Sequence, residues 1–273
     1  MKLEEIACTR HFLLVSDADY FPINAYACAL QFAQGYEKNL SFLVLLTKKQ
    51  LAHRDVIYET WNRQIETLQK KESIEIKVFF TESYFSELVP FTEQAETPML
   101  FFEISKNTQS NNPLSIFKQL KELRIPFVIT KDSQTNPIDL SKIIVPIGYL
   151  PEEKEKAPYS CNMGRFLHSE IILYQANDYG SKTTKNVESV LKLYNQFSLK
   201  VSIIKAKADS FGVEKEATMT TEKMQAGMVL VSTSRDYGLD DILFGPKELH
   251  CLKRATVPIM FINPRPDLYV LCW

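Results

Sequence analysis

The sequence predicts an α/β protein of two tandem domains, each a five-stranded parallel sheet with helices on both faces. Short apolar runs alternate strictly with helical runs, which is the pattern of parallel sheets joined by right-handed crossovers. The end of the chain also repeats its middle: Leu120–Thr130 (LKELRIPFVIT) is echoed by Leu252–Ile262 (LKRATVPIMFI), 132 residues later. The starts of the halves correspond as well, because Phe12–Asp17 matches Ile143–Gly148 at an offset of 131.

The first half supplies the first predicted sheet. Phe12–Ser16 is a short, continuous apolar run, which is typical of a buried parallel strand. Ile23–Lys38 places Ala25, Ala29 and Ala33 at helical spacing, with a proline near the first turn, where it is tolerated. The further predicted strands are Leu40–Thr47, Ile74–Phe80, Met99–Ile104 and Phe127–Thr130, and the further helices are Ala52–Lys71, Tyr84–Glu93 and Leu114–Leu123.

The second half repeats this order after a polar linker, Thr130–Ser141. We therefore expect one domain at residues 1–132 and a second at residues 141–273. The predicted strands are Ile143–Ile147, Ser169–Gln175, Lys200–Lys205, Met228–Ser232 and Ile259–Ile262. The predicted helices are Glu152–Phe166, Lys182–Phe197, a short one near Val213–Lys223, and Pro246–Arg254.

Composition narrows the classes of function. The 273 residues carry a formal net charge of −1 without a dense Lys/Arg cluster, which argues against nucleic acid as a partner. Met1–Glu5 carries acids where a signal peptide has bases, and no apolar run approaches the ~20 residues of a membrane span. We therefore expect a cytoplasmic protein that does not interact with membranes.

The cysteines and histidines do not suggest a metal site. The five cysteines never form a C-x-x-C pair, and Cys28 lies in an apolar helix pattern that predicts a buried thiol. The four histidines have no metal-ligand spacing with one another or with cysteine. No P-loop, G-x-G-x-x-G, H-E-x-x-H or G-x-S-x-G is present, so we expect no catalytic residues and no enzyme.

In parallel α/β folds, ligands bind beyond the carboxyl ends of the strands, and here the loops at that edge carry a family resemblance. Asp17 ends the first strand and is followed by Ala25, Ala29 and Ala33, eight, twelve and sixteen positions later. A second block runs from Met228 through Gly238-Leu-Asp-Asp-Ile-Leu-Phe-Gly245 to the last strand. The chain resembles a tandem universal stress protein over essentially its whole length. The resemblance implies two doubly wound, Rossmann-like domains of the adenine nucleotide alpha hydrolase type.

Many members of that family bind ATP with a Gly, a second Gly three residues on, and Gly-Ser or Gly-Thr after nine more. Glycines let backbone N–H groups close on phosphate oxygens, and the following helix N-terminus favours the charge. In the second half the matching positions are Ser232, Arg235, Gly245 and Pro246, so only the third glycine remains. The strand-one Asp, which in the family contacts adenosine, is replaced by Gly148. We therefore predict no ATP binding of the family kind in the second domain.

The first half departs from the pattern differently. It keeps Asp17, but its loop after the fourth strand has no glycine, and Glu103 occupies the first-glycine position. A carboxylate there repels a triphosphate unless it is turned away. Asp17 either organises the turn into the helix or contacts a ligand, and Arg235 in the second half either pairs with an anion or faces solvent. The alternative interpretation is that the first half binds ATP or AMP around Asp17, with the phosphates held by Ser105, Lys106, Asn107 or Asn111.

The sequence thus favours a non-enzymatic binding or regulatory protein without a cofactor, and the resemblance implies a stress-linked role. In the family, similar domains pair through their last strands, which implies an intramolecular pseudo-dimer here and leaves open both a homodimer and an unidentified protein partner. The candidate site residues are Asp17, Ser105, Asn107, Arg235 and Gly245. The apolar end, Leu268–Trp273, is predicted to dock as an added strand or to cover a hydrophobic face of this chain or a second one.

Overall fold

The computed structural model describes residues 9–82, 88–106, 112–234 and 245–265. The chain divides into two compact units, Met1–Thr135 and Asn136–Trp273. Among the described residues, no helix combines the length and the apolar character needed to cross a bilayer.

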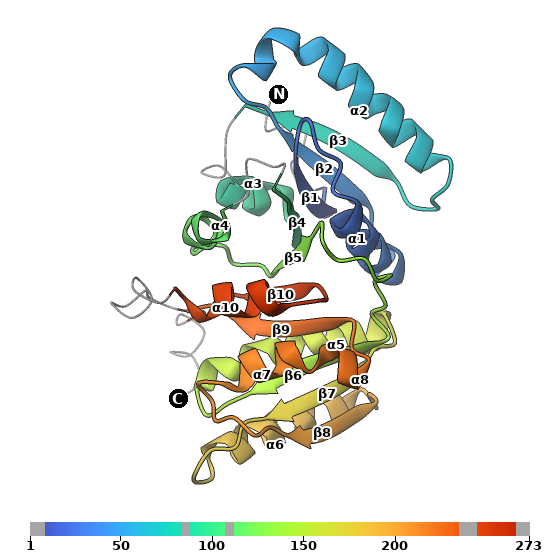
Figure 1. The fold of residues 1–273 in the computed structure, drawn as a ribbon. Coiled ribbons are helices and arrows are strands. Elements are labelled where there is room, and N and C mark those ends of the chain that lie inside the picture. The colour runs from blue at the N-terminus through green and yellow to red at the C-terminus, as the bar shows by residue number, and fades with distance from the viewer. Residues whose placement is uncertain (1–8, 83–87, 107–111, 235–244, 266–273) are drawn as a thin grey trace. The chain divides into compact units, whose positions relative to one another are not determined.

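The first unit holds a parallel sheet in the order β3-β2-β1-β4-β5 (Figure 1). The chain runs outward from β1 through β2 to β3 and then returns to β1's other side, which creates a switch in strand order beside β1. The strands are β1 (Phe12–Asp17), β2 (Leu40–Leu45), β3 (Ile76–Thr81), β4 (Leu100–Ile104) and β5 (Phe127–Lys131). The helices are α1 (Ile23–Gly35), the 3-10 helix η2 (Gln50–His53), α2 (Arg54–Gln69), α3 (Leu88–Ala95) and α4 (Pro113–Gln119).

The first core forms because β1 and β2 are buried along their entire lengths, as continuous apolar strands of a covered parallel sheet are. Phe12 packs edge-on against Phe101, and Phe32 of α1 completes this aromatic cluster with ring centroids 5.5–6.0 Å apart. Three fully buried alanines, Ala25, Ala29 and Ala33, form the face of α1 that packs into the core. Small side chains there let the helix lie close to the strands.

The second unit has the strand order β10-β9-β6-β7-β8, and all its pairs are parallel. Read from β8, this order corresponds element by element to that of the first unit. The strands are β6 (Lys142–Ile147), β7 (Glu170–Gln175), β8 (Val201–Lys205), β9 (Met228–Ser232) and β10 (Ile259–Ile262). The helices are η4 (Pro151–Glu155), α5 (Lys156–Phe166), α6 (Lys182–Gln196), α7 (Val213–Met219), α8 (Thr221–Met224) and α10 (Lys247–Arg254).

The predicted α/β class and strand sequence are confirmed, and Cys28 is a buried thiol as expected. Several predicted bounds are wrong. The first helix ends at Gly35 rather than Lys38, because Glu37 takes a left-handed conformation with φ of 52° that no α-helix continues through. The predicted helix Glu152–Phe166 begins as the 3-10 helix η4, and the one near Val213–Lys223 is divided at Thr220 into α7 and α8.

Candidate functional site

The carboxyl ends of β6 and β9 form the edge of the second unit at which parallel α/β folds generally bind ligands. Ile143 of β6 pairs with Met228, and Leu13 of β1 pairs with Leu100. Extending each register along the strands places Ser232 of β9 and Glu103 of β4 at equivalent positions. The two positions where the family pattern has its first glycine are therefore true structural counterparts.

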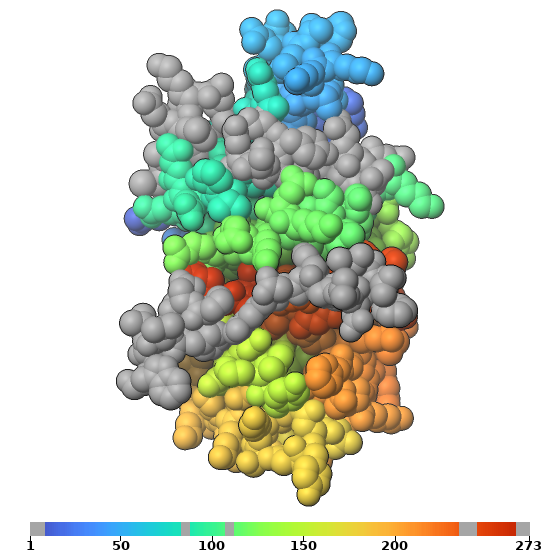
Figure 2. All heavy atoms as spheres, turned by 90° about the vertical axis from the view of Figure 1, so that its left-hand side faces the viewer, coloured from blue at the N-terminus to red at the C-terminus, as the bar shows by residue number. Residues whose placement is uncertain are grey.

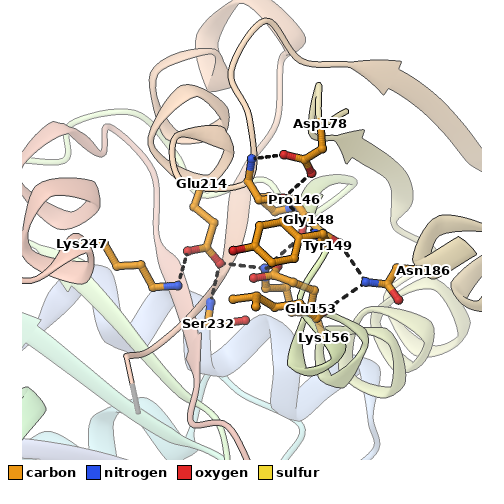
Figure 3. A network of polar contacts seen from close by, with 12 residues as sticks. Pro146, Gly148, Tyr149, Glu153, Lys156, Asp178, Asn186, Glu214, Ser232 and Lys247 are labelled. Atoms are coloured by element: carbon orange, nitrogen blue, oxygen red, sulfur yellow. Dashed lines mark hydrogen bonds and ion pairs between the residues drawn. The ribbon is translucent and has the colours of Figure 1, made fainter. Parts of the chain in front are cut away.

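A buried lysine occupies this edge in the second unit (Figure 3). Lys156, at the start of α5, is fully buried, and its Nζ lies 2.5 Å from Glu153 Oε2 and 2.7 Å from Glu214 Oε1. It also donates to the carbonyl oxygen of Pro146 at the end of β6, at 2.9 Å. The ammonium group thus has three acceptors, contributed by η4, by α7 and by the strand itself.

Glu214 connects this lysine to the other side of the edge. Its Oε1 also accepts the Ser232 N–H at 2.7 Å, and its Oε2 pairs with Lys247 of α10 at 2.9 Å. We call Glu153, Lys156, Glu214 and Lys247 the charge cluster. Its two buried carboxylates and two ammonium groups balance, which is the condition under which buried charges are tolerated.

The cluster changes the acidity of its members. Burial alone would raise the pKa of Glu214, but Lys156, Lys247 and the Ser232 N–H together lower it to about 2. Burial raises the pKa of Glu153, because the attraction of Lys156 does not fully offset its desolvation and the repulsion from Glu214. The two carboxylates raise the pKa of Lys156 against the opposing effect of its burial. The lysine is therefore held as an ammonium, and Glu214 as a carboxylate.

Cross-linked loops surround the charge cluster. The Asn186 side-chain amide donates to the carbonyl oxygens of Gly148 and Leu150, at 2.9 and 3.0 Å. Asp178 accepts the Ser210 N–H at 2.9 Å and the hydroxyl of the same residue. Any Cβ at Gly148 would collide with the Ser210 side chain, so a strand-ending Asp cannot stand there without moving that loop. In Figure 2 the yellow-green surface of η4 and α5 lies next to the orange surface around α7 on one face of this unit.

Glu103 fills the corresponding edge of the first unit. It is buried, with Oε2 accepting the Ala25 N–H at 2.8 Å and Oε1 accepting the Tyr20 hydroxyl at 2.5 Å. Burial and this carboxylate raise the pKa of Tyr20 well above its usual range. The carboxylate thus lies at the first turn of α1, where the helix dipole favours a negative charge. Both units place their own charged side chains at the ends of the strands.

A cavity lies beside the end of β1. It has a volume of about 350 Å³ and is lined mostly by the loop after β1 and by one side of α2. The indole N–H of Trp61 donates to the Ala18 carbonyl oxygen at 2.8 Å, which fixes the ring as one wall. The lining residues are Ala18, Asp19, Tyr20, Phe21, Val56, Ile57, Thr60, Trp61 and Gln64.

The candidate residues from the sequence do not form one site. Asp17 ends β1 and is buried, and Ser105 follows β4 and donates to Asp132 Oδ2 at 2.6 Å. Gly245 precedes α10 with φ of +79°, a left-handed conformation that favours glycine, and belongs to the other unit. Asn107 and Arg235 lie outside the described residues.

Sequence reasoning missed the charge cluster, although one signal pointed to it. Lys156 stands eight residues after Gly148, as Ala25 stands eight after Asp17, at a position where the family pattern has a small residue. A lysine in a core-facing helix position must find a buried carboxylate. No group of three or more His, Cys, Asp or Glu side chains that could hold a metal ion occurs within the described ranges.

Solved structures share this fold. A universal stress protein from Archaeoglobus fulgidus DSM 4304 covers 96% of this chain and 99% of its own, with a TM-score of 0.65 and 12% identity. A protein assigned to the universal stress proteins, from Pseudomonas aeruginosa UCBPP-PA14, covers 95% of both chains, with a TM-score of 0.58 and 15% identity. The cytoplasmic domain of a prokaryotic cation chloride cotransporter covers 96% of this chain and 100% of its own, with a TM-score of 0.56 and 11% identity.

No protein-family model and no curated protein sequence matches the chain. Similarity at 11 to 15% identity establishes a fold and no activity. From the strand order and these likenesses, we conclude that the chain has the fold of the universal stress proteins over most of its length.

Proposed function

We propose that this chain is a tandem universal-stress-type protein that acts as a non-enzymatic binding or regulatory protein and does not bind ATP in its second unit. The observation that carries the proposal is Lys156 Nζ, which is held by Glu153, Glu214 and Pro146 O at the ends of β6 and β9. A nucleotide entering this edge would meet two buried carboxylates whose ammonium partners are already engaged. Displacing one partner would leave a buried charge uncompensated, which costs about 3–5 kcal/mol.

A second candidate function is nucleotide binding in the first unit, favoured by the cavity of about 350 Å³ beside Asp17. Its aromatic and aliphatic walls suit a planar base. Two features oppose a polyphosphate there: Glu103 occupies the first-glycine position, and Ser105 already donates to Asp132. This candidate therefore favours a nucleoside or a monophosphate over ATP.

A thermal-shift assay with ATP, AMP and cyclic AMP separates the two functions. Ligand at 100 times its Kd stabilises a protein by about 2.7 kcal/mol, a readily measured shift. We expect no shift with ATP in a Thr60→Phe variant, in which the first cavity is filled. Thr67→Phe is the matched control, because both threonines lie exposed on α2 and donate to the carbonyl four residues earlier.

The outcomes are distinct. A shift with ATP that persists in Thr60→Phe would place the nucleotide outside the cavity and contradict our first proposal. A shift with AMP that is lost in Thr60→Phe and kept in Thr67→Phe would establish the second function. In a Trp273→Phe background, Trp61 is the remaining tryptophan, so its fluorescence reports directly on occupancy of the cavity. Release of phosphate or pyrophosphate from ATP would contradict the non-enzymatic part of the proposal.

A further inference from the structure

Three loops of the second unit present large apolar side chains at one edge. The loop after β6 carries Tyr149 and Leu150, the loop after β7 carries Tyr179, and the loop after β8 carries Phe211. Tyr179 is fully exposed, and Phe211 is 83% exposed. We call these four residues the aromatic edge. Side chains of this size dominate the energetics of interfaces when they become buried.

Hydrogen bonds connect the three loops that carry the aromatic edge. Asn177 N–H donates to the Ala208 carbonyl oxygen at 2.8 Å, and Tyr149 N–H donates to Ser210 Oγ at 2.8 Å. Asp178 accepts from Ser210, so each of the three loops is bonded to another. The rings of Tyr149 and Phe211 meet edge to face with centroids 6.0 Å apart. Because the backbone is already fixed, covering this surface orders few additional groups.

The described part of the chain ends at a residue that is bonded to the helix following Leu150. The last described residue, Arg265, is fixed by its N–H to both carboxylate oxygens of Glu155, at 3.0 Å each. Glu155 ends η4, which begins directly after Leu150. Five residues of 3-10 helix rise about 10 Å, so Glu155 lies roughly that far along the chain axis from Leu150 of the aromatic edge.

The remaining eight residues, Pro266–Trp273, read PDLYVLCW. Fully extended, eight residues reach about 26–29 Å, more than twice the roughly 10 Å between Glu155 and Leu150. Five of the last six side chains are large and apolar, and they match the exposed tyrosine, leucine and phenylalanine in chemistry. We propose that Leu268–Trp273 packs against the aromatic edge of its own second unit.

Disulfide trapping tests this proposal with a native thiol, Cys272. In a Cys8→Ser background the other cysteines, Cys28, Cys161 and Cys251, are buried and do not compete. Single variants Tyr179→Cys and Phe211→Cys place a thiol on the aromatic edge. Phe197→Cys is the control: it is also exposed, but it follows the far end of α6, a helix roughly 22 Å long.

We expect mild oxidation to form an intramolecular Cys272 disulfide in the two edge variants at least tenfold faster than in Phe197→Cys. Each disulfide forms by loss of two hydrogens to the added oxidant, which peptide mapping by mass spectrometry detects. Equal rates at all three positions, or no intramolecular product in the edge variants, would overturn the proposal. A disulfide-linked dimer as the main product would overturn it as well, because the occupant would then be a second copy.

A second measurement does not depend on new cysteines. Truncation after Asp267 should increase amide hydrogen exchange in residues 149–150 and 177–180 and raise binding of a hydrophobic dye several-fold. The added dye binding should disappear when Tyr179→Ser and Phe211→Ser are combined with the truncation. Unchanged exchange and dye binding after truncation would contradict the proposal.

Discussion

Lys156 places a buried positive charge at the carboxyl ends of β6 and β9, where the first unit has an alanine. Its counterpart in the first unit is Ala25, whose backbone N–H at the start of α1 donates to the Glu103 carboxylate. Lys156 instead brings a full positive charge into the interior, where it is fully buried. The charge is tolerated because Glu153 and Glu214 lie within 2.7 Å of its Nζ. The structure of the second unit therefore depends on the partners of this side chain.

We predict that Lys156→Met destabilises the protein by about 3–5 kcal/mol, because two buried carboxylates lose their shared ammonium partner. Urea denaturation of the full-length chain measures the change. Lys185→Met, at an exposed position of α6, is the control and should change stability by less than about 0.5 kcal/mol. Adding Glu214→Gln to Lys156→Met should recover part of the loss. Equal stability of the two single variants would show that the ion pairs of Lys156 contribute nothing to the free energy of unfolding.

Glu214 predicts an acid-dependent loss of stability. Its pKa is about 2 in the folded protein against an ordinary value of 4.5, so the ionised carboxylate stabilises the folded state above pH 4.5. This stabilisation disappears as the pH falls from 4.5 towards 2, a loss on the order of 3 kcal/mol for a shift of this size. Glu153, whose pKa is raised, acts in the opposite direction and offsets part of the loss.

We therefore expect Glu214→Gln to flatten the stability profile between pH 4.5 and 2, measured by urea denaturation at several pH values. Glu59→Gln is a suitable control, because Glu59 is largely exposed and pairs with Arg63 on the surface of α2. Identical acid profiles for wild type and Glu214→Gln would contradict the pKa assignment.

The strand β9 depends on a single glycine at its entrance. A Cβ at Gly227 would lie 1.6 Å from the Asp139 carbonyl oxygen, far closer than two non-bonded atoms can approach. The Gly227 N–H meanwhile donates to Lys142 O at 2.9 Å, which fixes the start of β9 beside β6. No other residue type fits here without separating these two backbone segments.

Gly227→Ala should therefore destabilise the second unit by at least about 3 kcal/mol, the upper range for overpacked sites. Gly180→Ala provides the comparison, since Gly180 has φ of +93° but no atom within 4 Å of its added Cβ. Conformational strain alone should make that change cost about 1 kcal/mol. Thermal unfolding measures both, and a smaller effect at Gly227 than at Gly180 would contradict the prediction.

The elements that the sequence predicts well are those with a local cause. The bounds of β9 and β10 agree with the prediction, because each is an apolar run that begins after a glycine or a proline and ends at a polar residue. The predicted end of α1 is wrong, because the observed end depends on the left-handed turn at Glu37. The position of Lys156 signalled a buried charge, but its partner could not be predicted, because Glu214 lies 58 residues away in the sequence and comes close only in the folded unit.

At the scale of the whole molecule, the fold does not determine the function. A universal stress protein and the cytoplasmic domain of a cotransporter cover this chain almost equally well. The fold thus occurs in proteins of different kinds, so it does not by itself establish a function. The pairing of the two units through their last strands, which the family resemblance implies, stays a prediction.

Cutting the chain between its units tests that pairing. We predict that residues 1–135 and 136–273, co-expressed as separate fragments with a tag on one, co-purify through the fragment interface. In the intact chain, tethering raises the effective concentration of one unit for the other to roughly millimolar. The separated fragments lack this tether, so a smaller fraction of them should be associated at the concentrations used. Two monomeric, non-associating fragments in size-exclusion chromatography would contradict intramolecular pairing.

The buried ammonium of Lys156 also constrains the evolution of this chain. Replacing Lys156 alone by a small residue would leave Glu153 and Glu214 buried without their shared ammonium partner and destabilise the fold. Losing either glutamate first would leave the lysine under-compensated instead. Each single loss among Lys156, Glu153 and Glu214 therefore passes through a less stable protein, so we expect these three residues to be kept or replaced together.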